Sequence, residues 1–400
     1  MTGTRLVLAV ILAISVARHA AAEQERDDRA SQYPTGLADS FVGINIGALN
    51  YPFSSVQLEG GHRAESIAAP RVAVQAVLFG HHFGPFLSAQ ATYMRPVNYV
   101  KYRNIEEHGT RSVWMHYGTL TMRARAPLMR RLSLYGEGGM AVSNRKGFDL
   151  GESPGVANAH FWSPLAGGGV EYHARPTWDL IAGVSYIPRH SEDKQPATLF
   201  ASAGFRYNMR KLSDDRVAET RAAGFFFPRQ LIQTGYSTHA LGFGANNFVS
   251  KTVPIFWGGA VEVRHSAFAL HYVRNLFHSK KLFSFDAGVS YGRWTSEGRQ
   301  GFQTFSAYPL MRFTFLRRRV ADAYLSYSLA GPSYISRTVI DGLDTGSHFT
   351  FQDFMGLGAF IGRTRHLNVE IGINHYSNGN LFSENAGVKI PLTLKLGYAF

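Results

Sequence analysis

The sequence contains no cysteine in its 400 residues. This absence excludes a disulfide framework, a thiol nucleophile and a cysteine metal site. Charged residues are scarce, at 17% against the ~25% that is usual for globular domains. Beyond the N-terminal region no apolar stretch approaches the length of about 18 residues that a spanning helix needs, so we predict no transmembrane helix.

The N-terminus has the features of an export signal. Arg5 supplies a positive charge, the stretch from Leu6 to Val16 is apolar except for Ser15, and Ala20 to Ala22 offers a cleavage site. The apolar stretch is too short to cross a bilayer, which takes roughly 20 residues. We therefore predict that residues 1–22 are a signal peptide and that the protein is exported.

Basic residues exceed acidic ones by 13. For an exported protein this excess favours a phosphate-bearing membrane surface as partner and argues against nucleic acid. Charge that only aids solubility is the alternative.

The dominant pattern after the signal is alternation with a period of two. Large apolar residues alternate with small or polar ones at 41–49, 71–80, 133–142, 178–187, 283–292 and 390–400. Such segments of about ten residues, separated by turns, are typical of a transmembrane antiparallel β-barrel. A soluble β-sandwich also alternates, but the small second face and the aromatic strand ends favour the membrane. We predict an all-β barrel protein.

The last segment, 390–400, supports this prediction. One face would hold Ile390, Leu392, Leu394, Leu396, Tyr398 and Phe400, and the other Pro391, Thr393, Lys395, Gly397 and Ala399. A lysine in the middle of a lipid face costs ~2–4 kcal/mol, so we expect Lys395 to point into the lumen. A terminal phenylalanine on such a strand resembles the C-terminal signal of bacterial outer-membrane barrels. The expected location is therefore the outer membrane.

The segments fall into two groups, which predicts two domains. We expect an outer-membrane barrel at 40–208, a charged linker or uncertain segment at 209–250, and a second barrel at 251–400. Dense charge in the linker cannot lie in hydrocarbon, and each flanking group suits a small eight-stranded barrel. One barrel of about sixteen strands, as in a porin-like channel, is the competing architecture.

A polar motif, His-Tyr-Ser-Asn, ends the last strand but one. Residues two apart share a face of a strand, so His375 and Ser377 should share the lipid-facing side. In the preceding strand Asp353 lies on the corresponding face. If the two strands form a hairpin around Thr364, Asp353 lies opposite His375, or opposite Ser377 after a shift of two. Three polar residues would then meet on the outer wall.

These residue types suit nucleophilic catalysis. A serine hydroxyl is a weak nucleophile until a histidine takes its proton, and an acid orients the histidine. Asn378 follows the serine, and its amide or nearby backbone N–H groups could stabilise an oxyanion if the chain bends at Gly379. The alternative is that these polar residues have no catalytic role and mark only the end of the strand at the membrane interface.

The motif INHYSNG, with FQDFMGLG one strand earlier, resembles the PagL-like lipid A deacylases. The resemblance covers roughly residues 255–400 and implies an eight-stranded outer-membrane barrel. It also implies an esterase, without cofactor, that removes an acyl chain, typically the 3-O chain, from lipid A of lipopolysaccharide. It assigns His375 as base, Ser377 as nucleophile and Asn378 as an oxyanion contributor.

One position departs from the family pattern. A glutamate that completes the triad stands twelve residues after the serine in the family, whereas this chain has Lys389. A lysine cannot accept a hydrogen bond from the histidine. Asp353 is the first substitute and Glu384 the second. The third possibility is that Lys389 at this position leaves the enzyme weak or inactive.

Other features point to no further chemistry. His62, His81 and His82 are read as ordinary loop histidines, so no metal is expected. The arginine runs at 130–131 and 317–319 fall at turns and are read as solvated charge. The competing function is a non-catalytic barrel that acts as a channel or as a structural or binding protein. The sequence leaves a homodimer open.

Overall fold

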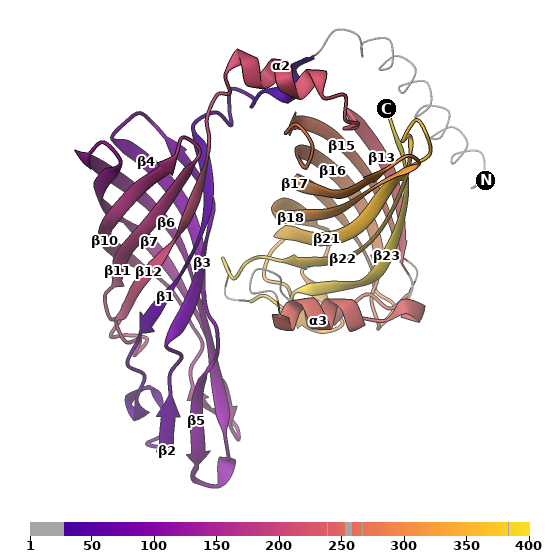
Figure 1. The fold of residues 1–400 in the computed structure, drawn as a ribbon. Helices are drawn as coiled ribbons and strands as arrows, with labels where there is room; N and C mark the ends of the chain where they lie inside the picture. The colour runs from indigo at the N-terminus through magenta and orange to yellow at the C-terminus, as the bar shows by residue number, and fades with distance from the viewer. Residues whose placement is uncertain (1–27, 238, 253–257, 266, 383) are drawn as a thin grey trace. The chain divides into compact units, whose positions relative to one another are not determined.

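The computed structural model describes residues 28–400 except 238, 253–257, 266 and 383. The signal peptide predicted for residues 1–22 lies outside the described residues. The chain divides into two compact units, one of residues 36–211 and one that joins the residues before 36 to residues 212–400. Each unit is built around one closed antiparallel barrel, coloured indigo to magenta and orange to yellow in Figure 1.

The first unit contains the N-terminal barrel. Its eight wall strands pair in chain order, and the ring closes where β1 pairs with β12. The wall strands are β1 (Ser40–Asn50), β3 (Val72–His82), β4 (Leu87–Pro96), β6 (Arg111–Met129), β7 (Leu132–Lys146), β10 (Ala159–Arg175), β11 (Trp178–Ile187) and β12 (Thr198–Met209). The connections add β2 (Ala64–Ala68), β5 (Val100–Ile105), β8 (Phe148–Leu150), β9 (Ser153–Val156), η2 (Ser55–Gln57) and η3 (Glu106–His108).

The second unit contains the C-terminal barrel, whose eight strands also pair in order and close where β13 meets β23. The wall strands are β13 (Gln230–Ser237), β15 (Ala267–His278), β16 (Phe283–Thr295), β17 (Gly301–Arg318), β18 (Ala321–Ile335), β21 (Phe349–Ile361), β22 (Leu367–Ser377) and β23 (Val388–Ala399). The remaining elements are η1 (Asp28–Ser31), α2 (Asp214–Ala222), η4 (His239–Leu241), α3 (Gly244–Thr252), β14 (Val261–Glu262), β19 (Val339–Ile340) and β20 (Leu343–Asp344).

The two closed rings confirm the predicted tandem of barrels. The alternative prediction of one barrel of about sixteen strands is wrong. The second ring begins with β13 at Gln230, inside the segment 209–250 that the sequence assigned to a linker or uncertain region. This strand has only eight residues, so its alternation gives little signal beside the charged segment that precedes it. No described helix is long and apolar enough to cross a membrane.

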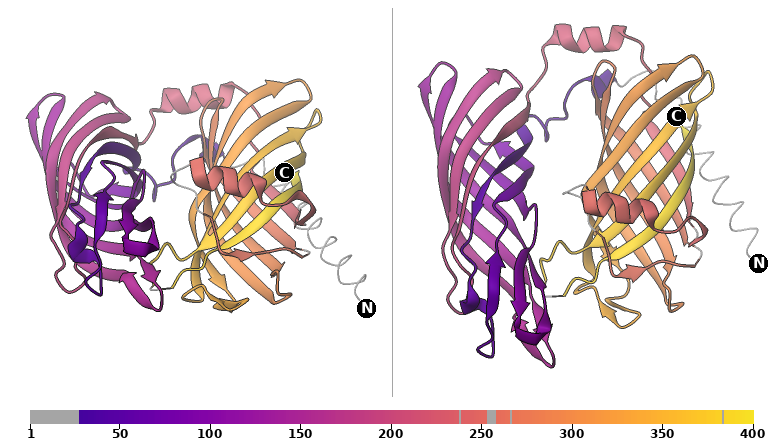
Figure 2. Two further views of the ribbon diagram at one scale, coloured as in Figure 1. Left: turned by 90° about the horizontal axis from the view of Figure 1, so that it is seen from below. Right: turned by 60° about the horizontal axis from the view of Figure 1, so that its bottom comes forward.

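We call the two ends of each barrel the turn end and the loop end. At the turn end of the C-terminal barrel, tight turns join β17 to β18 and β21 to β22, and β23 finishes. The loop end carries the long connections, which include the segment from η4 to β14 and the loop between β22 and β23. Figure 2 shows both barrels from two further sides.

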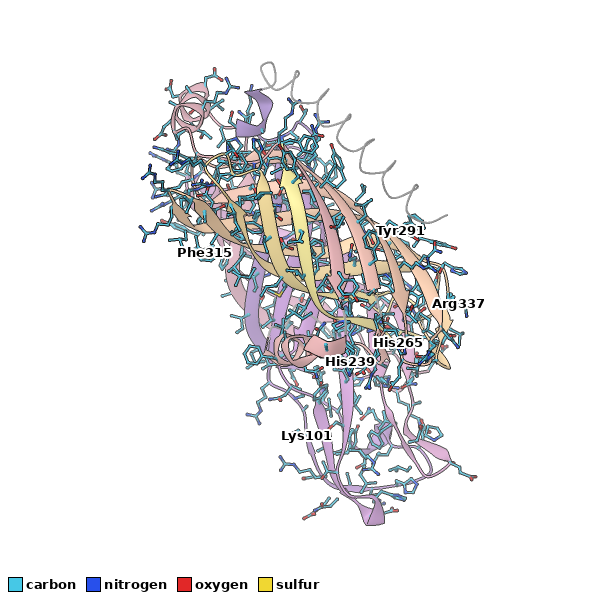
Figure 3. All side chains as sticks on the ribbon, turned by 90° about the vertical axis from the view of Figure 1, so that its right-hand side faces the viewer. Lys101, His239, His265, Tyr291, Phe315 and Arg337 are labelled. Atoms are coloured by element: carbon cyan, nitrogen blue, oxygen red, sulfur yellow. The ribbon has the colours of Figure 1, made fainter. Side chains whose placement is uncertain are left out.

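The interior of the C-terminal barrel is filled by charged and aromatic side chains. Lys395 Nζ lies 2.8 Å from Glu370 Oε1, and Arg312 Nη1 lies 2.7 Å from Asp286 Oδ2. Lys395 is 1% exposed, as expected for a lumenal lysine. Leucines and aromatics cover the outer wall, where Figure 3 shows Tyr291 and Phe315 pointing away from the barrel.

One face assignment in the last strand is wrong. Between Gly372 and Asn374 the pairing of β22 with β23 shifts, so that β23 carries one extra residue there. Such a bulge reverses the alternation beyond it, and Ile390 is fully buried instead of facing lipid. Pro391, which lacks a backbone N–H, lies at the bulge, where a missing ladder hydrogen bond is tolerated.

Candidate active site

The hairpin of β21 and β22 has the register that brings the predicted polar residues together. Asp353 pairs with His375, and Phe351 pairs with Ser377. On the far side of β22, His375 pairs with Lys389 of β23. Because directly paired residues lie on the same face, Asp353, His375 and Lys389 share the outer face of the wall, and Ser377 continues that face toward the loop end.

His375 and Asp353 are both buried although they are on the outer face. His375 is 0% exposed and Asp353 is 2% exposed. His375 Nδ1 lies 3.8 Å from Asp353 Oδ2, which is within ion-pair range but longer than a hydrogen bond. Asp353 is therefore the carboxylate that the hairpin places against the histidine ring.

A bulge in the next strand holds the aspartate. The pairing of β18 with β21 shifts between Ser328 and Gly331, and Ala330 adopts a left-handed conformation with φ of 52°. The Ala330 N–H, freed from the ladder, donates to Asp353 Oδ1 at 2.6 Å. A left-handed alanine costs of order 1–3 kcal/mol, and this charge-assisted hydrogen bond offsets part of that cost. It fixes one carboxylate oxygen and leaves the other toward the ring.

Ser377 is the last residue of β22 and is half-buried. Directly after Asn378 the chain turns, because Gly379 and Asn380 both have positive φ, 63° and 54°. Glycine and asparagine are the residues that adopt this conformation most readily. The bend expected at Gly379 is therefore present, and it leaves Ser377 at the edge of the wall.

Asn378 uses its donors to hold the surface loops. Its side-chain Nδ2 donates to Thr345 O at 2.8 Å and to Glu384 O at 2.6 Å, and its backbone N–H donates to Asn385 Oδ1 at 3.0 Å. Asn378 is fully buried. With these donors engaged, an oxyanion beside Ser377 would have to use other N–H groups, such as those in the turn that begins at Gly379.

Glu384 is the second candidate acid, and Lys389 stands where the PagL-like pattern has a glutamate. Glu384 is exposed, and its backbone carbonyl is the group that meets the site, through Asn378. Lys389 Nζ forms an ion pair with Glu262 Oε1 at 2.7 Å and lies 5.0 Å from the centre of the Phe243 ring. Lys389, which replaces the glutamate of the PagL-like pattern, is thus already paired with Glu262.

Glu262, which was not identified from the sequence, lies in β14 and links that strand to Lys389 beside the site. β14 pairs in parallel with the start of β23, with Val261 opposite Val388 and Glu262 opposite Lys389. Burial opposes ionisation of Glu262, but hydrogen bonds from Lys389 and Arg264 outweigh it and lower the pKa of this carboxyl. The carboxylate therefore stays charged and holds β14 against β23.

The helix α3, which precedes β14 in the chain, packs against the end of β22. Asn246 of α3 is 2% exposed and donates from Nδ2 to Asn374 O at 3.3 Å. This carbonyl lies at the bulge, where the ladder is interrupted. In Figures 1 and 2, α3 crosses the loop end of the C-terminal barrel beside β22 and β23. Because these contacts span more than a hundred residues, no local sequence pattern could have revealed them.

Gly387 is a further residue that the motif did not indicate. Its φ is 59°, and a Cβ atom there would lie 3.2 Å from His375 Nε2 and 3.2 Å from Gly259 Cα. Only glycine combines this conformation with such close packing. The loop between Ser377 and β23 therefore sets the position of the histidine ring as well as that of the serine.

Comparisons with known proteins found a matching family model for each half of the chain. Residues 267–398 match the family model of the lipid A 3-O-deacylase PagL, and residues 40–215 match the model of the OmpA-like transmembrane domain. No curated protein matches the chain. The matches confirm the resemblance of the C-terminal half to the PagL family and the outer-membrane barrel in each half.

Several solved outer-membrane barrels also align with part of the chain. The outer membrane enzyme PagL aligns over 42% of this chain and 97% of its own, at 18% identity and a TM-score of 0.29. The N-terminal barrel domain of Pseudomonas aeruginosa OprF aligns over 42% and 97%, at 12% identity and a TM-score of 0.28. Neisserial surface protein A aligns over 43% and 97%, at 16% identity and a TM-score of 0.28.

Proposed function

We propose that the C-terminal barrel is a serine esterase that removes an ester-linked acyl chain, most simply the 3-O chain, from lipid A in the outer leaflet. The observation that carries the proposal is the outward cluster of Asp353, His375 and Ser377 within the region that matches the PagL family model. In outer-membrane barrels the longer loops face the cell exterior, so the loop end of the wall is where a lipid in the outer leaflet would present its esters.

The roles follow from the hairpin geometry. Asp353 lies against His375 Nδ1, so Nε2 is the nitrogen that can take the proton of Ser377. The 3.8 Å separation would shorten to a hydrogen bond in the substrate complex, as catalytic contacts commonly do. The resulting imidazolium is stabilised by the buried carboxylate, which is the contribution expected of a triad acid.

The reaction would proceed in two acyl-transfer steps. Ser377 Oγ attacks the ester carbonyl while its proton passes to His375, which then protonates the departing sugar oxygen. Water then attacks the acyl-enzyme ester, loses a proton to His375 and releases the fatty acid, and the histidine returns the proton to Ser377. Backbone N–H groups in the turn at Gly379 are the donors nearest in sequence for the oxyanion. No cofactor enters either step.

The experiment is expression of the full chain in a Gram-negative host, followed by mass spectrometry of lipid A. We expect wild type to release one ester-linked acyl chain and Ser377→Ala to leave lipid A intact. Ser347→Ala, at the same loop end and outside the cluster, serves as the matched control. Identical lipid A from wild type and Ser377→Ala, with no ester cleavage by the purified protein, would refute the esterase proposal.

The same experiment addresses the competing reading of a non-catalytic barrel. The replacement of the family's acid by Lys389, and its ion pair with Glu262, are the features that favour an inactive member. The filled lumen argues against conduction, because charged pairs and aromatic rings occupy it. A structural or lipid-binding barrel would remain if no ester is cleaved.

A further inference from the structure

The turn end of the N-terminal barrel gathers arginines that the proposed esterase does not use. Arg130 and Arg131 form the turn between β6 and β7, Arg175 ends β10, and Arg210 follows β12. Successive wall strands alternate in direction, so these positions all lie at one end of the ring. The His173 N–H donates to Arg131 O at 2.8 Å, which fixes the first turn beside β10.

These residues surround a pocket of about 410 Å³ at the turn end. Arg125, Arg130, Arg131, Arg175 and Arg210 line it, and Asp179 is the one carboxylate among its lining residues. The arginines at 130 and 131 are exposed, as solvated charge would be, and they also line this pocket.

The carboxylate of Asp179 is already engaged within the barrel. Its Oδ2 accepts hydrogen bonds from Arg206 Nη2 at 2.9 Å and from Asn208 Nδ2 at 2.8 Å, and its Oδ1 lies 2.8 Å from His173 Nδ1. Both Asp179 and Arg206 are about 1% exposed. This acid therefore has little capacity left to neutralise the arginines at the mouth of the pocket.

The other lumenal acids are paired in the same way. Glu171 contacts Arg206 at 2.8 Å, Arg123 at 3.3 Å and Arg125 at 3.8 Å, and Glu137 contacts Arg123 at 3.4 Å. Three acids thus face three lumenal arginines. The four arginines at the turns are surplus, and among the described residues they form no ion pair.

We propose that this pocket binds an oxyanion of the phosphate type. A guanidinium group offers a planar fork of donors that matches phosphate oxygens in pairs. Four such groups around one cavity, with the nearby acids already paired, provide positive charge that no described residue neutralises. The same chemistry suits a free phosphate compound or the headgroup of an anionic phospholipid, and the experiment separates these sources.

The test uses the full chain purified in a maltoside detergent without phosphate. Isothermal titration is carried out with inorganic phosphate, and separately with dihexanoylphosphatidylglycerol and dihexanoylphosphatidylcholine below their micellar concentrations. The pocket variant is R130A/R131A. The matched control is R103A/R111A, which removes the same charge from the opposite end of the barrel. Folding of each variant is checked by heat-dependent migration on a gel.

We expect the pocket variant to bind the anion at least tenfold more weakly than wild type, and the control to bind as wild type does. If R130A/R131A does not fold, R210A takes its place with the same expectation. Binding of inorganic phosphate assigns a soluble ligand, and binding of phosphatidylglycerol alone assigns a lipid headgroup. No binding of either anion, equal binding of phosphatidylcholine, or equal loss in the control would overturn the proposal.

Discussion

Replacing Asp353 by Asn tests which acid serves His375. The carboxylate oxygen lies 3.8 Å from His375 Nδ1, and both side chains are buried. At an effective dielectric constant of about 20, unit charges at this distance attract by about 4 kcal/mol. If that attraction is realised only when the imidazolium forms, its loss lowers kcat by about 10³-fold, since 1.4 kcal/mol is a factor of ten.

The fold should tolerate this change. Asn retains an oxygen that can accept from the Ala330 N–H, so the bulge in β18 keeps its hydrogen bond. The assay is the initial rate of fatty acid release from purified lipid A by protein in detergent, with heat-dependent gel migration as the folding check. Glu384→Gln is the comparison variant, because the exposed Glu384 is the other candidate acid and should affect kcat less than threefold.

The two variants give opposite results under the competing assignments. A D353N protein that folds and keeps kcat within threefold of wild type would refute the reasoning from distance and burial. If E384Q instead loses two or more orders of magnitude, the loop must rearrange to bring Glu384 to the ring. A rate unchanged in both variants would show that the histidine works without an orienting acid.

Three further predictions follow from the C-terminal barrel. Gly387→Ala should lower kcat at least tenfold while the barrel still folds, because the new Cβ would press on the histidine ring and the positive φ disfavours alanine; a kcat equal to wild type would contradict this close packing. Lys395→Met should destabilise the barrel by ~3–5 kcal/mol, since it leaves Glu370 charged and buried; urea titration of the folded fraction measures this, and a loss below 1 kcal/mol would argue against it. The Glu262 carboxyl has a lowered pKa, so its pair with Lys389 should be intact above the ordinary glutamate value of ~4.3 and be lost only as the pH falls through the lower folded value. Hydrogen exchange of residues 258–264, corrected for the intrinsic rate, should therefore quicken only below the ordinary glutamate value in wild type and be fast at pH 7 in Glu262→Gln; equal protection in both proteins at pH 7 would count against the ion pair.

The fold and the centre of the candidate site were largely predictable, because both depend on short-range alternation. A period of two sets which face each residue of a strand occupies, and a tight hairpin sets the register. For that reason the lumenal position of Lys395, and a place for Asp353 opposite either His375 or Ser377, could be predicted without coordinates. The tandem of two barrels followed from two groups of alternating segments around a charged break.

The remaining features depend on contacts that local patterns do not encode. β13 became a wall strand because it pairs with β23, more than 150 residues away in the chain. The bulge at Pro391 reversed the face of Ile390, because one extra residue shifts the alternation. The partner of Lys389 is Glu262, which the register of β14 brings to it.

The sequence by itself therefore determined most of the wall strands, most of their faces and the identity of the polar cluster, because side-chain alternation is a property of neighbouring residues. The tertiary structure decided which carboxylate lies against the histidine, what covers the ring and which arginines share a pocket. Those outcomes depend on sheet closure, bulges and loop packing, which join residues that are distant in the chain.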